Sequence, residues 1–201
     1  MAQFPSEEFY EGRLQTGTPR TDEIASRLGA SMFPWPRHDR QLFPVVFVPC
    51  ASEEDFGRAS KGNSGQVELV KYILGLLRTP CDGREATAAL AQGVSVAVLT
   101  PYSRQVQLLK HELPEKGGAV VSTIDGFQGR EADVCVLSTV RSNIEGDIGF
   151  VEDARRLNVA WTRPKLGLIV VGSRSTLTAN SALWKRALVA CKEVEIQVPE
   201  V

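Results

Sequence analysis

The sequence predicts an α/β fold of three layers, in which a mostly parallel β-sheet carries helices on both faces. Short continuous apolar runs alternate along the chain with segments whose apolar residues recur at helical spacing. Continuous apolar runs are typical of strands that are covered on both faces, and helices between such strands indicate parallel connections. The 201 residues, 43% of them hydrophobic, supply enough apolar material for the core of one globular domain.

Residues 1–43 precede this alternation and are rich in proline, glycine and charged residues. We expect them to form an irregular lead-in that packs on the domain made by residues 44–201. The chain has three tryptophans, Trp35, Trp161 and Trp184. Because large aromatic side chains are mostly buried, we expect all three to pack in the interior rather than to stack on bases.

From residue 44 onward, strands and helices are expected to alternate. The apolar runs predict strands at 45–48, 94–99, 119–122, 134–140, 168–172 and 194–198. Helical spacing predicts helices at 65–77, 103–113 and 183–190, and a further helix begins after Asp153, which has the residue type of an N-cap. Ligands of parallel sheets bind beyond the carboxyl ends of the strands, so the polar segments that leave the strands there are candidates for binding.

Composition limits the class of protein. The net charge of −1 gives no global basic field, so any contact with a polynucleotide must be local. Cys50, Cys81, Cys135 and Cys191 lie far apart without metal-ligand spacing, which predicts reduced, buried thiols. Neither an apolar run of membrane-spanning length nor a signal-peptide pattern occurs. We therefore expect an intracellular protein, cytoplasmic or nuclear, with no membrane partner.

Residues 122–163 hold a Gln-Gly turn, an apolar strand and a helix that ends on Thr-Arg. Gly126 and Gly129 allow a tight turn whose free amides can point at a phosphate. Glu131 can accept a hydrogen bond from a ribose hydroxyl or face a metal-bound phosphate. Arg156 and Arg163 are seven residues apart, so they project from one face of the predicted helix. Each feature alone is more often structural, but together they predict two arginines beside a phosphate-binding turn.

In order and spacing, these segments resemble motifs V and VI of the superfamily-one helicases. The matching stretches are FQGRE, then DVCVLSTVRSN, then IGFVEDARRLNVAWTR. The branch that they resemble is typified by the RNA helicase of nonsense-mediated decay. Residues 6–17 resemble a further segment of this family, one that follows its first domain. The resemblance covers residues 6–198 and implies the second RecA-like domain of an ATP-dependent helicase that acts on RNA or DNA.

The resemblance also implies a nucleotide site, in which Gln128, Gly129, Glu131, Arg156 and Arg163 contact ATP. Arg163 would be the arginine finger and the catalytic residue. The chain lacks a G-x-x-x-x-G-K-[ST] sequence. We therefore expect ATP with Mg²⁺ to bind against an N-terminal RecA-like domain of the same protein, which holds the metal. On its own, the chain is expected to be inactive.

A single strand of RNA or DNA is the expected polymer partner, held through its backbone. TPYxxQ resembles the helicase segment that follows this backbone, and Thr123 stands at the hydroxyl position that opens motif V. From residue type alone, helix capping explains Thr100 and Ser103 equally well. The candidate contact residues are Thr100, Pro101, Tyr102, Gln105, Thr123, Arg141 and Asn143.

Two residues depart from the family pattern. Trp161 stands where relatives have a smaller residue, and Pro164 replaces the alanine after Thr-Arg. Because proline disfavours helical geometry in the residue before it, the direction in which Arg163 leaves the helix is open. The alternative function is a catalytically silent nucleic-acid-binding or scaffold module with the same fold. A Walker A lysine upstream would decide between the two.

Overall fold

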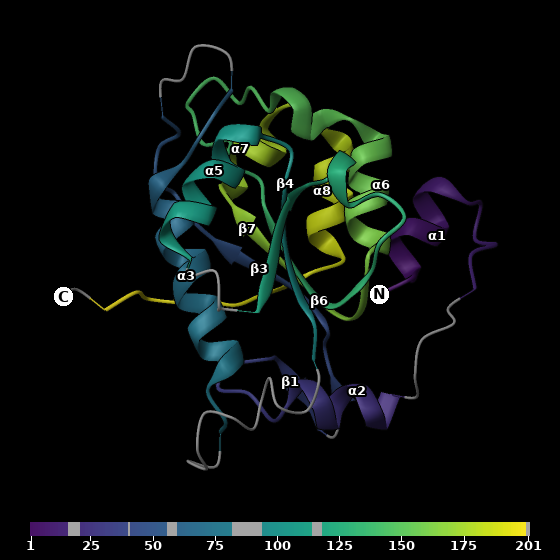
Figure 1. Ribbon diagram of the computed structural model, residues 1–201. Coiled ribbons are helices and arrows are strands. Elements are labelled where there is room, and N and C mark those ends of the chain that lie inside the picture. The colour runs from purple at the N-terminus through teal and green to yellow at the C-terminus, as the bar shows by residue number, and fades with distance from the viewer. Residues whose placement is uncertain (16–20, 40, 56–59, 82–93, 114–117, 200–201) are drawn as a thin grey trace.

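Six parallel strands form one sheet in the computed structural model, which describes residues 1–15, 21–39, 41–55, 60–81, 94–113 and 118–199. The strand order is β5-β4-β6-β7-β3-β8. Their bounds are β3 Val45–Pro49, β4 Val96–Thr100, β5 Ala119–Thr123, β6 Ala132–Ser138, β7 Pro164–Gly172 and β8 Lys192–Glu193. Helices lie on both sides of this sheet (Figure 1). The predicted three-layer α/β fold is therefore confirmed.

The four inner strands, β4, β6, β7 and β3, each contribute side chains to two separate cores. On β3, Phe47 faces one core, whereas Val46 and Val48 face the other. Side chains of a strand alternate between the faces of the sheet, so a strand covered on both faces must be apolar at every position. This explains why the strands appear in the sequence as continuous apolar runs.

The helices divide between the two faces (Figure 1). One face is covered by α6 (Ala154–Thr162), α7 (Arg174–Ala179) and α8 (Ala182–Val189), with α1 (Gln3–Phe9) against α6. The other face is covered by α2 (Thr21–Leu28), α3 (Ser64–Arg78) and α5 (Ser103–Glu112). In the part of the chain that is described, no helix is long and apolar enough to cross a membrane.

Local signals fix several helix starts. Asp153 accepts hydrogen bonds from the backbone N–H groups of Arg155 and Arg156, which confirms the predicted N-cap of α6. The Asn63 side chain caps α3 in the same way, through the backbone N–H of Gln66. Such caps satisfy donors that have no partner inside a helix. The tryptophan prediction also holds, since Trp35, Trp161 and Trp184 are all buried.

The prediction of an irregular lead-in is wrong in part. Residues 1–43 contain α1, α2 and a short antiparallel pair, β1 (Arg37–His38) with β2 (Gln41–Leu42). These elements are short, so they carry too few apolar residues for a periodic signal. The lead-in does pack on the sheet domain: the ring centroids of Phe4 and Trp161 lie 4.8 Å apart.

Three further expectations are corrected. The predicted strand at 194–198 does not form, and only Lys192 and Glu193 pair with β3. The partner strand ends at Pro49, which has no N–H to continue a ladder. Helix α7 was not expected, because its six residues hold one buried leucine, Leu177. Cys81 is exposed rather than buried, whereas Cys135 is buried.

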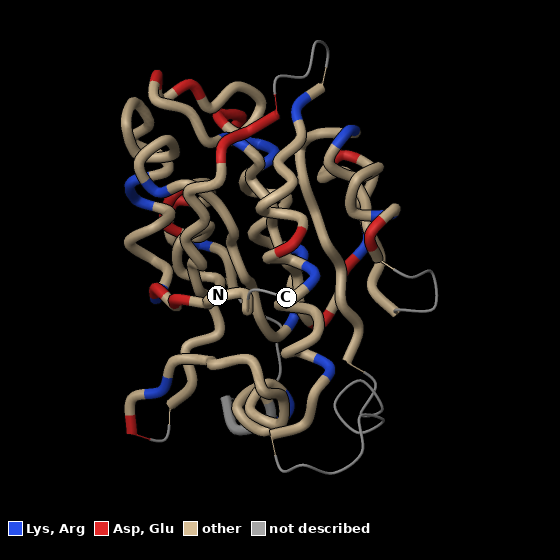
Figure 2. Tube along the Cα trace, turned by 90° about the vertical axis from the view of Figure 1, so that its left-hand side faces the viewer, with Lys and Arg blue, Asp and Glu red and all other residues tan. Residues whose placement is uncertain are grey.

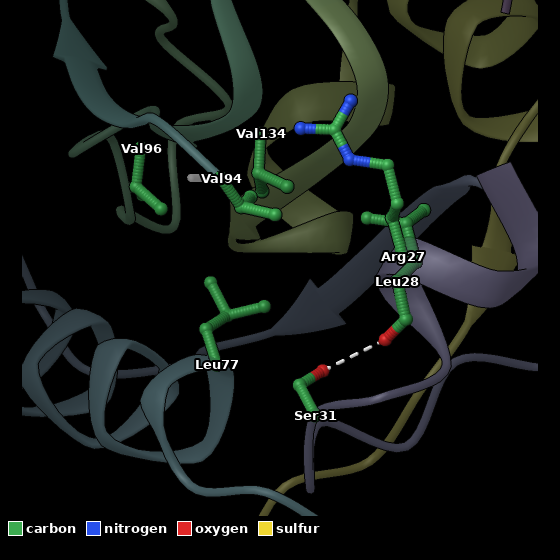
Figure 3. A pocket seen from close by; sticks show the side chains of 7 residues that line it. All are labelled: Arg27, Leu28, Ser31, Leu77, Val94, Val96 and Val134. Carbon is green, nitrogen blue, oxygen red and sulfur yellow. Dashed lines mark hydrogen bonds between the residues drawn. The ribbon is translucent and has the colours of Figure 1, made fainter. Parts of the chain in front are cut away.

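A hollow lies at the amino ends of β4 and β6, where α2 and the end of α3 meet the sheet (Figure 3). The hydroxyl of Ser31 donates to the carbonyl of Leu28 at 2.9 Å beside it. Most of its lining is apolar, which fits a packing defect better than a ligand site. The lining residues are Arg27, Leu28, Ser31, Leu77, Val94, Val96 and Val134.

The contact between the lead-in and β7 is testable at Gly167. A Cβ on Gly167 would lie 2.7 Å from the ring of Trp35 and 3.2 Å from Leu28, so Gly167→Ala must displace the lead-in. We expect the free energy of unfolding to fall by about 1–3 kcal/mol, as overpacking generally costs. In a Trp35→Ala background most of that loss should vanish, because the clash is gone. Chemical denaturation of the wild type, the two single variants and the double variant measures this double-mutant cycle.

Gly75→Ala is the matched control, since nothing lies within 4 Å of a Cβ there and the residue is exposed within α3. It should leave stability unchanged or raise it by about 0.5–1 kcal/mol, because alanine is the better helix former. Equal losses from Gly167→Ala with and without Trp35 would contradict the packing described here.

Candidate nucleotide and nucleic-acid sites

The loop of residues 124–131, here called the Gln-Gly loop, connects the carboxyl end of β5 to the amino end of β6. Because these strands are parallel, the loop must run the length of the sheet. Its first part is a 3₁₀ turn, Asp125–Phe127, which buries Phe127 and leaves Asp125 exposed. Gly129 has a φ of +78° with open space around it, so the backbone conformation, not crowding, calls for glycine.

Helix α6 runs beside this loop and is attached to it at both ends. Near the carboxyl edge of the sheet, Arg156 donates from Nε to both carboxylate oxygens of Asp125, at 3.0 and 3.1 Å, and from Nη2 at 2.9 Å. At the other end, Nη1 of Arg163 donates to the carbonyl of Arg130 at 3.2 Å. Both arginines thus reach the Gln-Gly loop from the same side of α6.

Pro164 does not turn Arg163 away from the helix. Arg163 keeps helical angles, φ −82° and ψ −33°, and its Nε donates to the carbonyl of Val159 at 3.1 Å. Its guanidinium has backbone carbonyl and hydroxyl partners, and no carboxylate among the described residues pairs with it. Arg156 differs, because its hydrogen bonds to Asp125 raise the pKa of its guanidinium. The guanidinium stays protonated, and the Asp125 carboxylate balances its positive charge.

The remaining nucleotide candidates, Gln128 and Glu131, are exposed. Glu131 lies beside the amino end of β6, and its carboxylate is 3.5 Å from the ammonium of Lys165 on β7. Arg163 lies at the same end, since Ala132 of β6 pairs with Pro164 of β7. The predicted nucleotide residues Glu131 and Arg163 are therefore at the end of the sheet opposite to the carboxyl edge.

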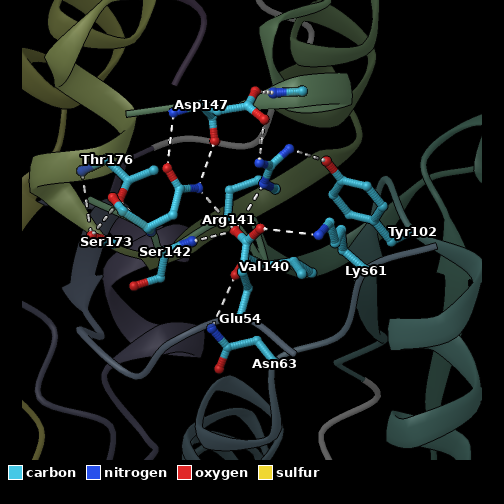
Figure 4. A network of polar contacts seen from close by, with 12 residues as sticks. Glu54, Lys61, Asn63, Tyr102, Val140, Arg141, Ser142, Asp147, Ser173 and Thr176 are labelled. Atoms are coloured by element: carbon cyan, nitrogen blue, oxygen red, sulfur yellow. Dashed lines mark hydrogen bonds and ion pairs between the residues drawn. The ribbon is translucent and has the colours of Figure 1, made fainter. Parts of the chain in front are cut away.

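At the carboxyl edge, a polar network is centred on Glu54, in the segment that follows β3 (Figure 4). One oxygen of Glu54 accepts hydrogen bonds from Arg141 Nε at 2.8 Å, from the Ser142 N–H at 2.9 Å and from Asn143 Nδ2 at 3.0 Å. Burial alone would raise the pKa of Glu54, but these three donors outweigh it and lower the pKa. The carboxylate is therefore ionised and holds three consecutive residues.

Arg141 occupies the middle of this network and is itself buried. Besides Glu54, it donates to Asp147 at 2.7 Å and to the hydroxyl of Tyr102 at 3.4 Å. Burial alone would lower the pKa of Arg141, but the hydrogen bonds to Tyr102, Asp147 and Glu54 outweigh burial, so the pKa is raised. Hydrogen bonds from Arg141 and from the Gly149 N–H lower the pKa of Asp147. Arg141 thus forms ion pairs with two carboxylates, those of Glu54 and Asp147.

The chain enters this network through a strained turn at Val140. Val140 is fully buried with a φ of +69°, and the Arg141 N–H donates to the Thr139 carbonyl at 2.8 Å, which is a γ-turn of the rare positive-φ type. A β-branched residue in this region costs on the order of 1–3 kcal/mol. The Gln66 side chain accepts a hydrogen bond from the Val140 N–H at 2.9 Å, and the Asn63 side chain donates one to the Val140 carbonyl at 3.0 Å. The start of α3 therefore holds the turn.

The predicted strand-binding residues divide into buried and partly exposed ones. Thr100, Tyr102, Gln105 and Arg141 are buried, so none of these four side chains is open to a ligand here. The Thr100 hydroxyl accepts the Tyr102 N–H at 3.4 Å, a contact of the capping kind. The partly exposed residues are Pro101, Thr123 and Asn143.

Gln105 shows what the buried group does. Its side-chain oxygen accepts the Asn63 N–H at 2.8 Å, and its Nε2 donates to the Asn63 carbonyl and the Ser138 hydroxyl at 3.2 and 3.1 Å. Gln105 therefore joins α5, the start of α3 and the end of β6 from beneath the edge. Thr123, by contrast, stays at the surface and accepts the Gly126 N–H at 3.0 Å.

Sequence reasoning did not find Glu54, Gln66 or Asp147. One usable signal was the position of Glu54 five residues beyond a buried strand, where a side chain reaches the carboxyl edge. Nothing local in the sequence links Asn63 to Val140, 77 residues away.

Breaking the network at Glu54 should destabilise the fold in a pH-dependent way. We expect Glu54→Gln to lower the free energy of unfolding at pH 7 by about 2 kcal/mol, since hydrogen bonds to charged groups contribute about 1.5–3 kcal/mol each. The folded-state pKa of Glu54 lies below the ordinary value of 4.5, so its stabilisation is present above that value and is lost as the pH falls. The variant and the wild type should therefore converge in acid. Denaturation curves across this pH range measure the difference.

The neighbouring Glu53 is exposed, and Glu53→Gln is the matched control, with a change expected within about 0.5 kcal/mol at every pH. A loss at Glu54 that is the same at pH 7 and in acid would show that its charge is not what holds the network.

Comparison with known proteins agrees with this architecture. A family described as AAA domain matches residues 1–175. The C-terminal domain of a possible DNA helicase from Lactobacillus plantarum superimposes with a TM-score of 0.51 at 13% identity. That similarity covers 89% of this chain and 99% of the other, and it supports the fold alone.

Three curated relatives show the branch. The chain is 33% identical to the ATP-dependent helicase upf1 of Schizosaccharomyces pombe over 96% of its length, 35% identical to the Regulator of nonsense transcripts 1 homolog of Drosophila melanogaster over 98%, and 31% identical to the ATP-dependent helicase NAM7 of Saccharomyces cerevisiae over 96%. It spans only 20%, 16% and 19% of these relatives' own lengths. The chain therefore belongs to the AAA domain family, and it matches the C-terminal RecA-like domain of superfamily-one helicases in the branch of the nonsense-transcript regulators.

Proposed function

We propose that this chain is the C-terminal motor domain of an ATP-dependent helicase that acts on a single strand of RNA or DNA, and that it supplies motifs V and VI. The observation that carries the proposal is the attachment of α6 to the Gln-Gly loop at both ends, through Arg156 and through Arg163. The relatives' names, which include ATP-dependent helicases, support it. The free cysteines support a reducing compartment, the cytoplasm or the nucleus.

The residues at the amino end of β6 fit one side of an ATP. Gly129 has the backbone conformation and open space to bring its amide close to a phosphate. Glu131 is exposed and can accept a ribose hydroxyl. Arg163 has no carboxylate partner among the described residues, so its positive charge remains for a phosphate. ATP with Mg²⁺ supplies the phosphoryl group, and we place the metal on an N-terminal RecA-like domain of the same protein.

In this scheme Arg163 is the arginine finger. A guanidinium held at its Nε by the Val159 carbonyl is fixed in direction, so it can meet charge that develops on the transferring phosphoryl group without first reorganising. Gln128 would contact the nucleotide from the loop. Arg156 was expected to contact ATP, but it is paired with Asp125 near the carboxyl edge, so we assign it a role in positioning α6 rather than a direct contact with the nucleotide. Alone, the chain would lack the metal-holding half and would turn over no ATP.

The single strand is proposed to lie over the carboxyl edge. Pro101, Thr123 and Asn143 would contact its backbone, and the buried Gln105 and Arg141 would shape the edge beneath them. Figure 2 shows Lys and Arg residues interspersed with Asp and Glu residues along the described trace, with acidic residues at this edge. Because Lys61, Arg104, Arg141 and Arg156 at this edge are each paired with a carboxylate, binding would depend on hydrogen bonds and stacking more than on phosphate neutralisation by these residues.

Hydrolysis and strand movement would be coupled along α6. Closure of the two RecA-like domains on ATP acts on Arg163 at one end of the helix, and the Arg156–Asp125 pair passes the displacement to the carboxyl edge at the other. No carboxylate of the described residues pairs with Arg163, and a charge left in this way favours the motor over a catalytically silent binding module.

The finger role is tested at Arg163 in the complete helicase. We expect Arg163→Ala to lower strand-stimulated kcat by about 10³–10⁵-fold, the range that arginine fingers supply. Binding of a non-hydrolysable ATP analogue should change far less, because the residue acts mainly in the transition state. Arg163→Lys should rescue little, since a point charge cannot replace the planar fork. Steady-state turnover and analogue titration measure both quantities.

Arg155→Ala is the matched control, because Arg155 is an exposed arginine of the same helix. It should keep kcat within a few-fold of the wild type. If Arg163→Ala behaves like Arg155→Ala, Arg163 is not a finger and the silent-module alternative stands.

A further inference from the structure

Phe150 is a large aromatic side chain that the fold leaves 56% exposed. It belongs to a 3₁₀ turn, Gly149–Glu152, between the polar network and the start of α6. The turn therefore lies at the carboxyl edge, next to the segments that contain Pro101 and Asn143. Leaving apolar area in water is unfavourable by about 25 cal/mol per Å², so a ring held in this position needs a reason.

The Phe150 ring is held firmly despite its exposure. Its centroid lies 5.7 Å from that of Tyr102 at an interplanar angle of 45°, and Tyr102 is itself buried and bonded to Arg141 (Figure 4). The guanidinium carbon of Arg156 lies over the ring, 5.3 Å from its centroid. Phe150 is thus held by Tyr102, which belongs to the polar network, and by Arg156 of α6.

The residue before it shows how closely the turn is fitted. Gly149 has a φ of +49°, and a Cβ there would collide with the guanidinium of Arg141 and lie 2.9 Å from the Tyr102 hydroxyl. The Gly149 N–H donates to Asp147 at 2.9 Å. Only glycine lets the turn approach the network this closely, and that approach fixes where the next side chain, Phe150, is presented.

We propose that Phe150 is a stacking platform for an unpaired base of the single strand, a contact that rests on the proposed function and adds a base contact to it. A flat apolar ring fits the π-face of every base and offers nothing to a phosphate. The Arg156 guanidinium over the ring helps to hold it in a fixed position. Ile144, in the same segment, is 97% exposed but has no flat face, so it cannot serve in this way.

The assignment also fits the charges at this edge. Arg141 and Arg156 are both paired with carboxylates, so a strand lying here gains little from phosphate contacts with them. Stacking supplies affinity that does not need an unpaired cation. It is also tolerant of sequence, as a motor that moves along any strand requires.

The test compares two ligands with the complete protein: a fluorescent single-stranded oligonucleotide and an abasic backbone of the same length and charge. We expect Phe150→Ala to weaken binding of the base-bearing strand by about 5- to 150-fold, the equivalent of one lost base stack. Binding of the abasic strand should stay at the wild-type level, which also shows that the variant is folded. Phe150→Trp should keep or strengthen binding of the base-bearing strand. Fluorescence anisotropy measures all the affinities.

Ile144→Ala is the matched control, an exposed apolar side chain of the same segment, and should change neither affinity. Equal losses on both strands after Phe150→Ala would assign the ring a purely structural role and overturn the inference. Unchanged binding of both strands would also overturn it and leave the ring to a protein partner. If the wild-type protein bound neither strand, the proposed function itself would fail, and the inference with it.

Discussion

The structure depends on the pairing of α6 with the Gln-Gly loop, and topology makes that pairing unavoidable. The loop connects the carboxyl end of β5 to the amino end of β6, and α6 lies in the connection from the carboxyl end of β6 to the amino end of β7. Both connections step in the same direction along the strand order, so right-handed crossovers place them on the same face of the sheet, and Phe127 and Leu157 do pack in one core there. Arg156 and Arg163, two helical turns apart, attach the helix to the loop near both edges. One rigid element thus joins the two ends of the sheet.

The arginines at the two edges are used differently. Near the carboxyl edge, Arg141 forms ion pairs with Glu54 and Asp147, and Arg156 forms one with Asp125. Both arginines hold backbone segments in place. At the opposite end, Arg163 has backbone carbonyl and hydroxyl partners and keeps its charge. Arg141 and Arg156 therefore stabilise the carboxyl edge, whereas Arg163 remains available to bind an anion.

Much of the fold, and part of the site, could be predicted from local sequence. Continuous apolar runs in the sequence predict the buried strands. Asp153 has the residue type of an N-cap, and the seven-residue spacing of Arg156 and Arg163 places both on one side of α6. Long-range contacts left no local signal: Arg141 meets Glu54 across 87 residues. The burial of Thr100 and Gln105 was missed for the same reason, because polar residues at a strand end are read as exposed until their partners from α3 and β6 are known.

The central claim, that α6 couples the two edges through its contacts with the loop, is tested most directly by exchanging the partners of the Arg156–Asp125 pair. Strand-stimulated ATP turnover of the complete protein would be measured for Asp125→Arg, for Arg156→Asp and for the two changes together. Each single change should lower the stimulated rate by about tenfold, the equivalent of about 1.4 kcal/mol of interaction between the pair, and the exchange should recover most of that loss. Losses that simply add in the exchanged protein would contradict the account.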